Sequence, residues 1–536
     1  MTMRLKIDKL NFLIYLKLLK LDIILVILLI GSLELSGCAN TTTTKAPNIS
    51  NLNSTNPVVS CRSFFVTLNQ SIIKAGVADN QSNQIPDFPY LRVNRFLASY
   101  KTSNLDDNQF NFWVSKLQDL ANKTYRVEIN NLPQLPKQFE ASLSKYSDQR
   151  KILITTVNYC SNILKHNALI NTDQRNLLQH TVSVPSDYIL WQRILGIYPL
   201  TFIPMVIAVQ KGQNDSIDTF KIPLAQLKTK GQLTRYITSQ LNSESTSQIE
   251  TIIAQATQNP LHIPLPSPQA TQILFNTFAP IWEIDVANNE DKIGKVAWAK
   301  NGKLPEIITN SPTTYQYISY NFWGNNVLLQ LNYIIWFPSR PKTSAFDLLG
   351  GNLDSLIWRV TLLPNGVPLV YDSIHGCGCY REFFPTQALQ PINAIRNLTV
   401  DEKAFVPQKA PELLRGQHTV IRIASLTHYI ERVYADSPTQ ATSASSTLTI
   451  PYVWLPYNNL RSLPRADGSN MDLFPPNGII SETKRNERYL LWPMGVPAPG
   501  SMREWGHHAT SFAGQSFYDD PFLLEENFES KNISNR

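Results

Sequence analysis

Apolar positions recur at helical spacing from residue 61 to about residue 260. One stripe covers 65–72 and a second covers 112–120, where every third or fourth side chain is large and apolar. Asp106 or Asp107 precedes the second stripe as a candidate N-cap, and prolines at 133 and 136 end it. Further helical patterns cover 138–166 and 174–180. The sequence therefore predicts an α-helical domain at 61–260.

The segment 194–209 stands out from this helical region because it has no charged residue. Pro199 and Pro204 interrupt it, so a regular membrane-spanning helix is not expected. Two interpretations stay open. The segment is either a buried connection packed against the core or a loop that dips into a lipid leaflet, the one that would also hold a lipid anchor of this chain.

The pattern changes to β-type alternation after three closely spaced prolines at 264, 266 and 268. Strands are predicted at 327–337, 356–363 and 367–375, and a strand or hairpin at 418–434. Asn365-Gly366 predicts a hairpin with a type I′ turn, in which both central residues have positive φ. The segment 439–447 is expected to be a linker or surface loop. We predict an α+β protein with a β-rich, mostly antiparallel domain at 271–536 and an irregular C-terminal region.

The first residues have the layout of an export signal. Five Lys or Arg residues precede an apolar run at 23–33, and Leu35-Ser36-Gly37-Cys38 follows that run. These four residues resemble the lipobox of bacterial lipoproteins. The resemblance implies a signal peptide at 1–37, lipid such as palmitate on Cys38, and a flexible polar tether at 38–60. An uncleaved anchor helix ending near Leu33 is the alternative.

The residue after the lipidated cysteine is Ala39. In lipoproteins of two-membrane bacteria, Asp at that position usually retains the protein in the inner membrane. The resemblance therefore implies the outer membrane, facing the periplasm. The body also resembles long, uncharacterised lipoproteins of bacterial envelopes, through His375-Gly376-Cys377-Gly378-Cys379-Tyr380 and the segment from Met494-Gly495-Val496-Pro497 to His508. That resemblance supplies no site roles.

Four cysteines remain if Cys38 carries lipid. Disulfides are permitted in an oxidising envelope compartment, and four cysteines allow three connectivities. Cys61–Cys160 is the favoured pair, because Cys377 and Cys379 sit together in a separate motif. Such a bond would close a loop of about 100 residues and contribute on the order of 4 kcal/mol.

The motif around residue 377 offers the most explicit candidate chemistry. His375, Cys377 and Cys379 would share one face of a strand, but only a turn at Gly376 or Gly378 would bring their ligand atoms together. Three interpretations stay open: a Cys377–Cys379 disulfide or structural turn, a zinc or iron site, and a catalytic thiolate. A metal site needs a further ligand, for which His507 or His508 is the candidate; alternatively, both histidines are hydrogen-bonded packing residues.

Charge and aromatic content complete the functional prediction. Removing 1–37 takes away five basic and three acidic residues and lowers the net charge from +7 to +5, which argues against nucleic-acid binding. Trp454, Trp492 and Trp505 lie in Pro/Gly-rich segments that could contact a glycan or an envelope protein. The charged run 484–488 is expected to be a solvated face. We predict a membrane-anchored envelope lipoprotein with a binding or structural role. The alternative is a metal- or thiol-dependent hydrolase whose catalytic residues the sequence does not identify.

Overall fold

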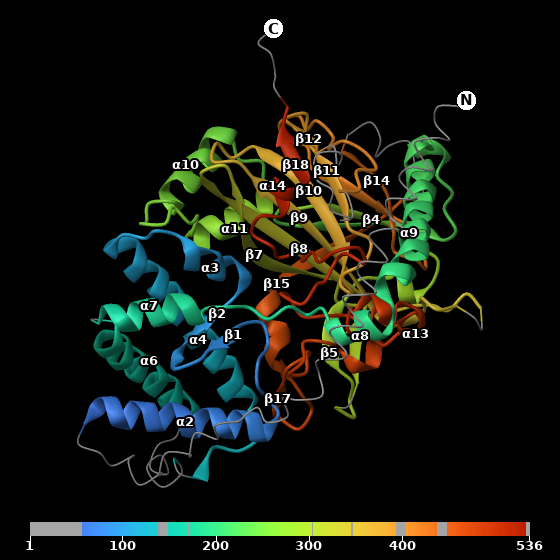
Figure 1. Cartoon of the computed structure of the whole chain (residues 1–536). Coiled ribbons are helices and arrows are strands. Elements are labelled where there is room, and N and C mark those ends of the chain that lie inside the picture. The colour runs from blue at the N-terminus through green and yellow to red at the C-terminus, as the bar shows by residue number, and fades with distance from the viewer. Residues whose placement is uncertain are drawn as a thin grey trace. The chain divides into compact units, whose positions relative to one another are not determined.

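A computed structural model describes residues 56–137, 139, 148–169, 171–302, 304–344, 347–392, 404–436 and 447–531 (Figure 1). All of them belong to one compact unit, Ser54–Arg536. The predicted signal peptide, Cys38, most of the tether and most of the 439–447 linker lie outside the described residues. The observed architecture is α+β, as the sequence predicts, with long helices concentrated in the N-terminal half and a large sheet in the C-terminal half.

Three helices form the N-terminal layer: α2 (Pro57–Ala75), α4 (Asp107–Asn131) and α6 (Gln149–Ala168), which pack against one another (Figure 1). The predicted apolar stripe of α2 is buried, and Asp106 caps α4 in a reciprocal capping box with Gln109. Cys61 and Cys160 form a disulfide that ties α2 to α6, which confirms the favoured pairing.

Shorter elements surround these helices. A hairpin of β1 (Asn83–Ile85) and β2 (Phe88–Val93), which the helical pattern does not predict, packs beside α4. The remaining helices of this half are α3 (Arg95–Ala98), α7 (Thr172–Thr181), α8 (Leu190–Leu195), α9 (Tyr198–Lys221), α10 (Thr246–Ala256) and α11 (Pro268–Thr277).

The segment 194–209 is helical and exposed, so its interpretation as a buried connection is wrong. It spans the end of α8 and the first half of α9. Pro199 lies in the first turn of α9, where its missing N–H has no intrahelical partner to lose. Pro204 lies inside the helix, on an exposed face where water can bind the Leu200 carbonyl.

The main sheet has ten strands in the order β11-β10-β9-β8-β7-β15-β3-β4-β13-β14. Their bounds are β3 Gln232–Thr238, β4 Ile281–Val286, β7 Thr313–Trp323, β8 Asn326–Arg340, β9 Gly351–Leu362, β10 Pro368–His375, β11 Glu382–Pro385, β13 Thr419–Ile423, β14 Ile430–Ala435 and β15 Leu448–Pro456. Most pairs are antiparallel; β15 runs parallel to both its neighbours, and β13 runs parallel to β4.

Strand β15 joins two halves of this sheet. Its first five residues, Leu448–Tyr452, pair with β3, and its last four, Val453–Pro456, pair with β7. Because β3 precedes residue 260 in the chain, the predicted boundary between 61–260 and 271–536 does not separate two compact units.

The predicted hairpin between β9 and β10 is present, but its turn is not type I′. Only Gly366 has a positive φ, of 79°, and its N–H donates to the Leu363 carbonyl at 2.9 Å. Pro364 fixes a negative φ one position before Asn365, which favours a type I turn followed by a left-handed glycine. A register shift between Pro368 and Val370 absorbs the extra residue.

Both faces of the sheet are buried. One face packs against α10, α11 and Phe220 of α9, through a cluster that includes Ile253, Phe275 and Trp358. The other packs against the C-terminal region, including η5 (Tyr457–Ser462) and Trp505. This double burial explains why β8 is almost continuously apolar, and why its Gln330 and Asn332 hydrogen-bond within the sheet.

The C-terminal region is held by short elements rather than by a continuous sheet. Small two-stranded pairs and short helices occur between and after the strands of the main sheet: β5 (Lys295–Trp298) with β6 (Pro305–Ile308), β12 (Leu389–Pro391) with β18 (Phe528–Ser530), β16 (Leu463–Pro464) with β17 (Asn470–Met471), α13 (Arg488–Leu491), η7 (Trp492–Met494) and α14 (Leu523–Asn527). Arg461 of η5 reaches the N-terminal layer and binds Asp79, so the two halves share a buried polar interface.

Candidate functional site

A polar recess of about 160 Å³ lies where the N-terminal layer meets the C-terminal region. Its walls come from three segments: 80–95, 184–187 and 506–519. Arg95 is at the start of α3, where Asn94 caps the helix and directs the following side chain. Its guanidinium binds Asp519 at 3.2 Å and Asp187 at 3.3 Å, and stacks on the Phe517 ring at 3.5 Å.

His507 forms another wall of the recess and is held as an imidazolium. Its Nδ1 lies 2.9 Å from an Asp187 carboxylate oxygen, and its Nε2 lies 2.9 Å from the Asn80 carbonyl oxygen. Both partners are acceptors, so both ring nitrogens donate. Burial alone would lower the pKa of His507, but the bond to Asp187 outweighs it and raises the pKa to about 9. The recess thus presents two fixed cations, Arg95 and His507, beside two carboxylates.

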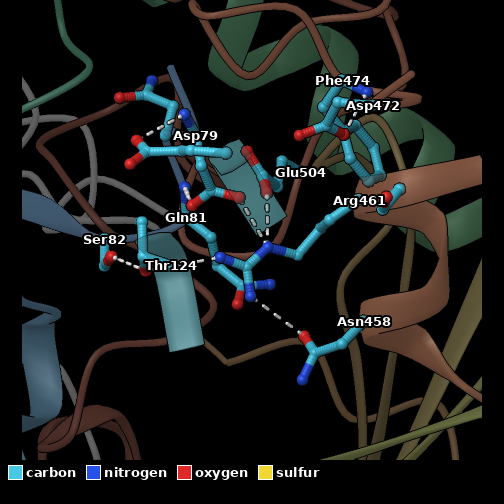
Figure 2. Close-up of polar contacts among 12 residues, drawn as sticks. Asp79, Gln81, Ser82, Thr124, Asn458, Arg461, Asp472, Phe474 and Glu504 are labelled. Carbon is cyan, nitrogen blue, oxygen red and sulfur yellow. Dashed lines mark hydrogen bonds and ion pairs between the residues drawn. The ribbon is translucent and has the colours of Figure 1, made fainter. Parts of the chain in front are cut away.

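Three carboxyl groups converge next to this recess, as Figure 2 shows: Asp79, Asp472 and Glu504. One oxygen from each lies within 4.8 Å of the others. We call these three residues the carboxylate triad. Asp79 follows α2, Asp472 follows β17, and Glu504 precedes Trp505 in an irregular segment, so distant parts of the chain supply them. Asn80, Gln81, Gly506 and His507, chain neighbours of two triad members, line the recess.

One cation accompanies the triad. Arg461 Nε donates to Asp79 at 2.6 Å and lies 3.8 Å from Glu504 (Figure 2). The backbone N–H of Phe474 donates to Asp472. Burial raises the pKa of Glu504 well above its usual range, and the Asp79 and Asp472 charges add to that; burial and Asp79 do the same for Asp472.

A second buried pair supports the triad from α4. Arg92 of β2 binds Glu128 at 3.1 Å, and Glu128 also accepts the backbone N–H of Asp79 at 3.1 Å. Burial raises the pKa of Glu128 to about 7 despite the attraction of Arg92. Glu128 and Arg92 pair with each other, so Arg461 is the one cation among the described residues that forms ion pairs with the triad itself.

His375, one of the predicted ligands, belongs to a different cluster centred on Asp354 of β9. Asp354 accepts from His428 Nδ1 at 2.8 Å, and lies 3.3 Å from Arg485 and 3.5 Å from His375 Nδ1. Arg485 is 2% exposed, so the prediction of a solvated face at 484–488 is wrong at this residue. None of the four residues is more than 2% exposed, which closes this cluster to a substrate in the observed conformation.

The backbone around this cluster is strained. His428, Leu353, Tyr380 and Leu426 all adopt positive φ values between 50° and 66°, although none is a glycine. Burial alone would lower the pKa of His428, but Asp291 and Asp354 on its two sides outweigh it and raise the pKa. Its ring stacks on Phe337 with the centroids 3.8 Å apart. Packing and ion pairing together hold His428 in this conformation.

The predicted turn after β10 is present. The Gly378 N–H donates to the His375 carbonyl at 2.8 Å, and Gly378 has a φ of 89°. Cys377 and Cys379 are free thiols that hydrogen-bond to each other, which lowers the pKa of Cys377 and raises that of Cys379. The structural-turn interpretation fits this geometry, without a disulfide in the motif.

The structure does not assemble the predicted zinc or iron site from His375, Cys377, Cys379 and His507 or His508. Within the described ranges, the carboxylate triad is the only group of three or more His, Cys, Asp or Glu residues spaced to hold a metal. His375 faces Asp354, and both nitrogens of His507 are occupied. His508 is buried, which lowers its pKa to about 3.

Sequence reasoning missed most residues of the recess and the triad. Asp79, Asp187, Arg95 and Asp472 stand in no local motif, and Glu504 is notable in the sequence only for its proximity to His507. Their convergence depends on tertiary contacts between distant loops, which no spacing rule detects. The one sequence signal that led to this region was the histidine pair at 507–508.

Comparison of the chain with protein-family models, with curated proteins and with solved structures finds no match.

Proposed function

We propose that this chain is a membrane-anchored lipoprotein of a bacterial envelope, lipidated on Cys38, whose role is binding rather than catalysis. The lipobox and the apolar run before it support a location in the cell envelope. Ala39 favours attachment to the outer membrane, with the protein facing the periplasm. The observation that carries the proposal is an exposed apolar surface on α8, the first half of α9, α13 and η7, which contact one another in series (Figure 1).

This apolar surface is large for a part of a protein that is exposed to water. Its side chains are between 38% and 70% exposed. They are Leu190, Trp191, Ile194, Leu195, Ile197, Leu200, Ile203, Ile207, Tyr489, Leu490 and Trp492. Contiguous exposed apolar side chains mark a protein or membrane contact, and tryptophan and tyrosine are the residues that favour the lipid headgroup region.

The one charged residue between 190 and 210, Arg193, points into the protein, so the part of the surface on α8 and the first half of α9 presents no charge. Its guanidinium donates to the carbonyls of Met494 at 2.8 Å and Gly514 at 2.7 Å, and packs over the Tyr188 and Tyr198 rings. Gly196 lets α8 approach η7 closely, since a Cβ atom there would lie 2.4 Å from Pro493 Cβ.

We assign this surface to a phospholipid membrane. Among the residues that the structure describes, no helix has both the length and the apolar character needed to cross a bilayer. Cys38 lies 18 positions before Asn56, and a chain of that length extends to at most about 60 Å. A lipid on Cys38 would therefore hold the apolar surface near the leaflet, and two weak attachments together anchor a protein stably.

Two experiments test this proposal. Labelled palmitate should enter the full chain and be absent from Cys38→Ser. In the Cys38→Ser background, flotation with phosphatidylethanolamine/phosphatidylglycerol vesicles should recover the chain, and adding Leu195→Glu and Ile207→Glu should weaken binding on the order of a hundredfold, because each buried side chain contributes about 1.5 kcal/mol or more.

The matched control is Leu414→Glu, since Leu414 is 74% exposed but lies outside the apolar surface. Equal vesicle binding by the double variant and this control would contradict the membrane assignment. Absence of palmitate from the wild-type chain would contradict lipidation.

The polar recess supports the binding role. Arg95 and His507 offer fixed positive charge beside Asp187 and Asp519, a pattern that suits a small ligand or a protruding group of an envelope protein or glycan with both donors and acceptors. The alternative, a metal- or thiol-dependent hydrolase at His375, Cys377 and Cys379, gains less support because Cys377 and His375 are buried and tied into structural contacts.

A further inference from the structure

We propose that Asp79, Asp472 and Glu504 bind one divalent cation, with calcium preferred over magnesium. This inference goes beyond the proposed envelope function and does not depend on it. The ligands would be the carboxylate oxygens that converge in Figure 2. Such oxygens are the donors that hard divalent cations prefer.

Glu504 provides the first argument, because its carboxylate is buried and receives no hydrogen bond from any residue that the structure describes. The residue is 0% exposed, and neither carboxylate oxygen has a hydrogen-bond partner in the described ranges. Its nearest cation is Arg461 Nε, at 3.8 Å, beyond hydrogen-bond distance. Buried carboxylates normally accept several hydrogen bonds. The Glu504 carboxylate accepts none, which indicates that a positively charged partner is missing from the triad.

The charge of the cluster provides the second argument. When ionised, the three carboxylates carry three negative charges, and Arg461 supplies one positive charge by binding Asp79. Glu128 does not alter this count, because Arg92 pairs with it. A residual charge of two remains in a buried site, and one divalent cation would neutralise it.

The spacing of the oxygens provides the third argument. Calcium binds oxygen at about 2.3–2.6 Å, so ligands on opposite sides of the ion lie up to about 5 Å apart. The triad oxygens lie within 4.8 Å of one another and meet this condition without movement. Magnesium demands a near-ideal octahedral arrangement and gives up its bound water reluctantly, whereas calcium accepts irregular sets of oxygens, so three carboxylates from unrelated loops suit calcium better.

The polar recess is lined by residues that adjoin two triad members in the chain. Asn80 and Gln81 follow Asp79, and Gly506 and His507 lie two and three positions after Glu504; all four line the polar recess. Backbone carbonyl and water oxygens commonly complete calcium coordination when a site has few carboxylates. Trp505 adjoins Glu504 in the chain and provides an optical reporter for the site.

The test uses the full chain, purified in detergent and stripped of metal with a chelator. Calorimetric titration with CaCl₂ should show one ion per chain, and MgCl₂ should bind more weakly. Tb³⁺ should give luminescence on tryptophan excitation that calcium displaces. Glu504→Gln keeps the side-chain volume and removes one buried charge, so it should fold, and it should weaken calcium binding at least roughly tenfold.

The matched control is Glu529→Gln, which makes the same exchange at an exposed position outside the triad and the recess and should leave calcium affinity unchanged. No binding by the wild-type chain up to about 5 mM calcium, above the range of extracellular calcium modules, would overturn the proposal. Unchanged calcium affinity in Glu504→Gln, or loss of calcium binding in Glu529→Gln, would place the ion elsewhere and would equally overturn the proposal.

Discussion

Glu382 is a buried carboxyl group with no cationic partner among the residues that the structure describes, and replacing it with glutamine should stabilise the protein at neutral pH. It begins β11, is 8% exposed and accepts a hydrogen bond from Ser216 Oγ of α9 at 3.2 Å. Burial raises its pKa to about 8, because the ionised form would lose its hydration without gaining a counter-charge.

The sign of the effect follows from proton binding. The folded state holds the proton more tightly than the unfolded state, whose carboxyl has a pKa of 4.5. Glu382 therefore does not lower the free energy of unfolding below about pH 4.5. Between about pH 4.5 and pH 8, the folded state loses stability as the pH rises. At 1.36 kcal/mol per pH unit the loss reaches about 3 kcal/mol at pH 7.

Glutamine stays neutral and keeps an oxygen for Ser216. Glu382→Gln should therefore raise the free energy of unfolding by about 3 kcal/mol at pH 7, and by less than about 1 kcal/mol at pH 5. Urea denaturation at pH 5, 6, 7 and 8 measures both values. Glu529→Gln, at an exposed position in β18, is the control and should have little effect at any pH. A gain that is equal at pH 5 and pH 8, or a loss at pH 8, would refute the reasoning.

Three further predictions concern other buried contacts. Replacing Cys61 and Cys160 with alanine should lower the free energy of unfolding by about 4 kcal/mol, measured by urea denaturation, because the disulfide closes a loop of 99 residues; a loss below 1 kcal/mol would contradict this. Asp372→Asn should lower the free energy of unfolding by about 3–5 kcal/mol in the same measurement, because Arg359 would keep a fully buried charge. Asp119→Asn, at a more exposed ion pair, should lower it by less than about 1 kcal/mol. NMR titration of His507 should give a midpoint near 9, which Asp187→Asn moves down toward 6.5; its raised pKa stabilises the fold below pH 6.5, and this contribution is lost as the pH rises through 9. A wild-type midpoint at or below 6.5 would show that the imidazolium assignment is wrong.

Local patterns predicted the elements whose contacts are local in sequence. The helices α2 and α4 follow from apolar spacing and from the Asp106 cap, and β8, β9 and β10 form a meander with short connections. The turn type at Asn365-Gly366 was wrong because the rule for the dipeptide ignored the preceding Pro364. The disulfide between Cys61 and Cys160 could be inferred because the other two cysteines shared a motif.

Elements that depend on distant partners were missed. Strand β3 is short and lies among helices, and it is stabilised by β4 and by β15, which is far away in the sequence. The carboxylate triad has the same origin, since its three loops meet only when η5 docks on the N-terminal layer. The predicted metal ligands at 375–379 are not among the described groups spaced to hold a metal, and Asp354 in the neighbouring strand lies 3.5 Å from His375.

The position of β15 has a consequence for how the chain is made. Its first segment pairs with β3 and its second with β7, so the two halves of the large sheet cannot join before Leu448–Pro456 has been synthesised. Chains emerge from the ribosome N-terminus first, and the facing edges of β3 and β7 must wait for almost the whole polypeptide. Unpaired strand edges recruit other chains, and non-local pairing folds slowly. Biogenesis of this protein therefore requires protection of two open edges until late in synthesis, and a chain truncated before β15 should aggregate rather than persist as a smaller folded form.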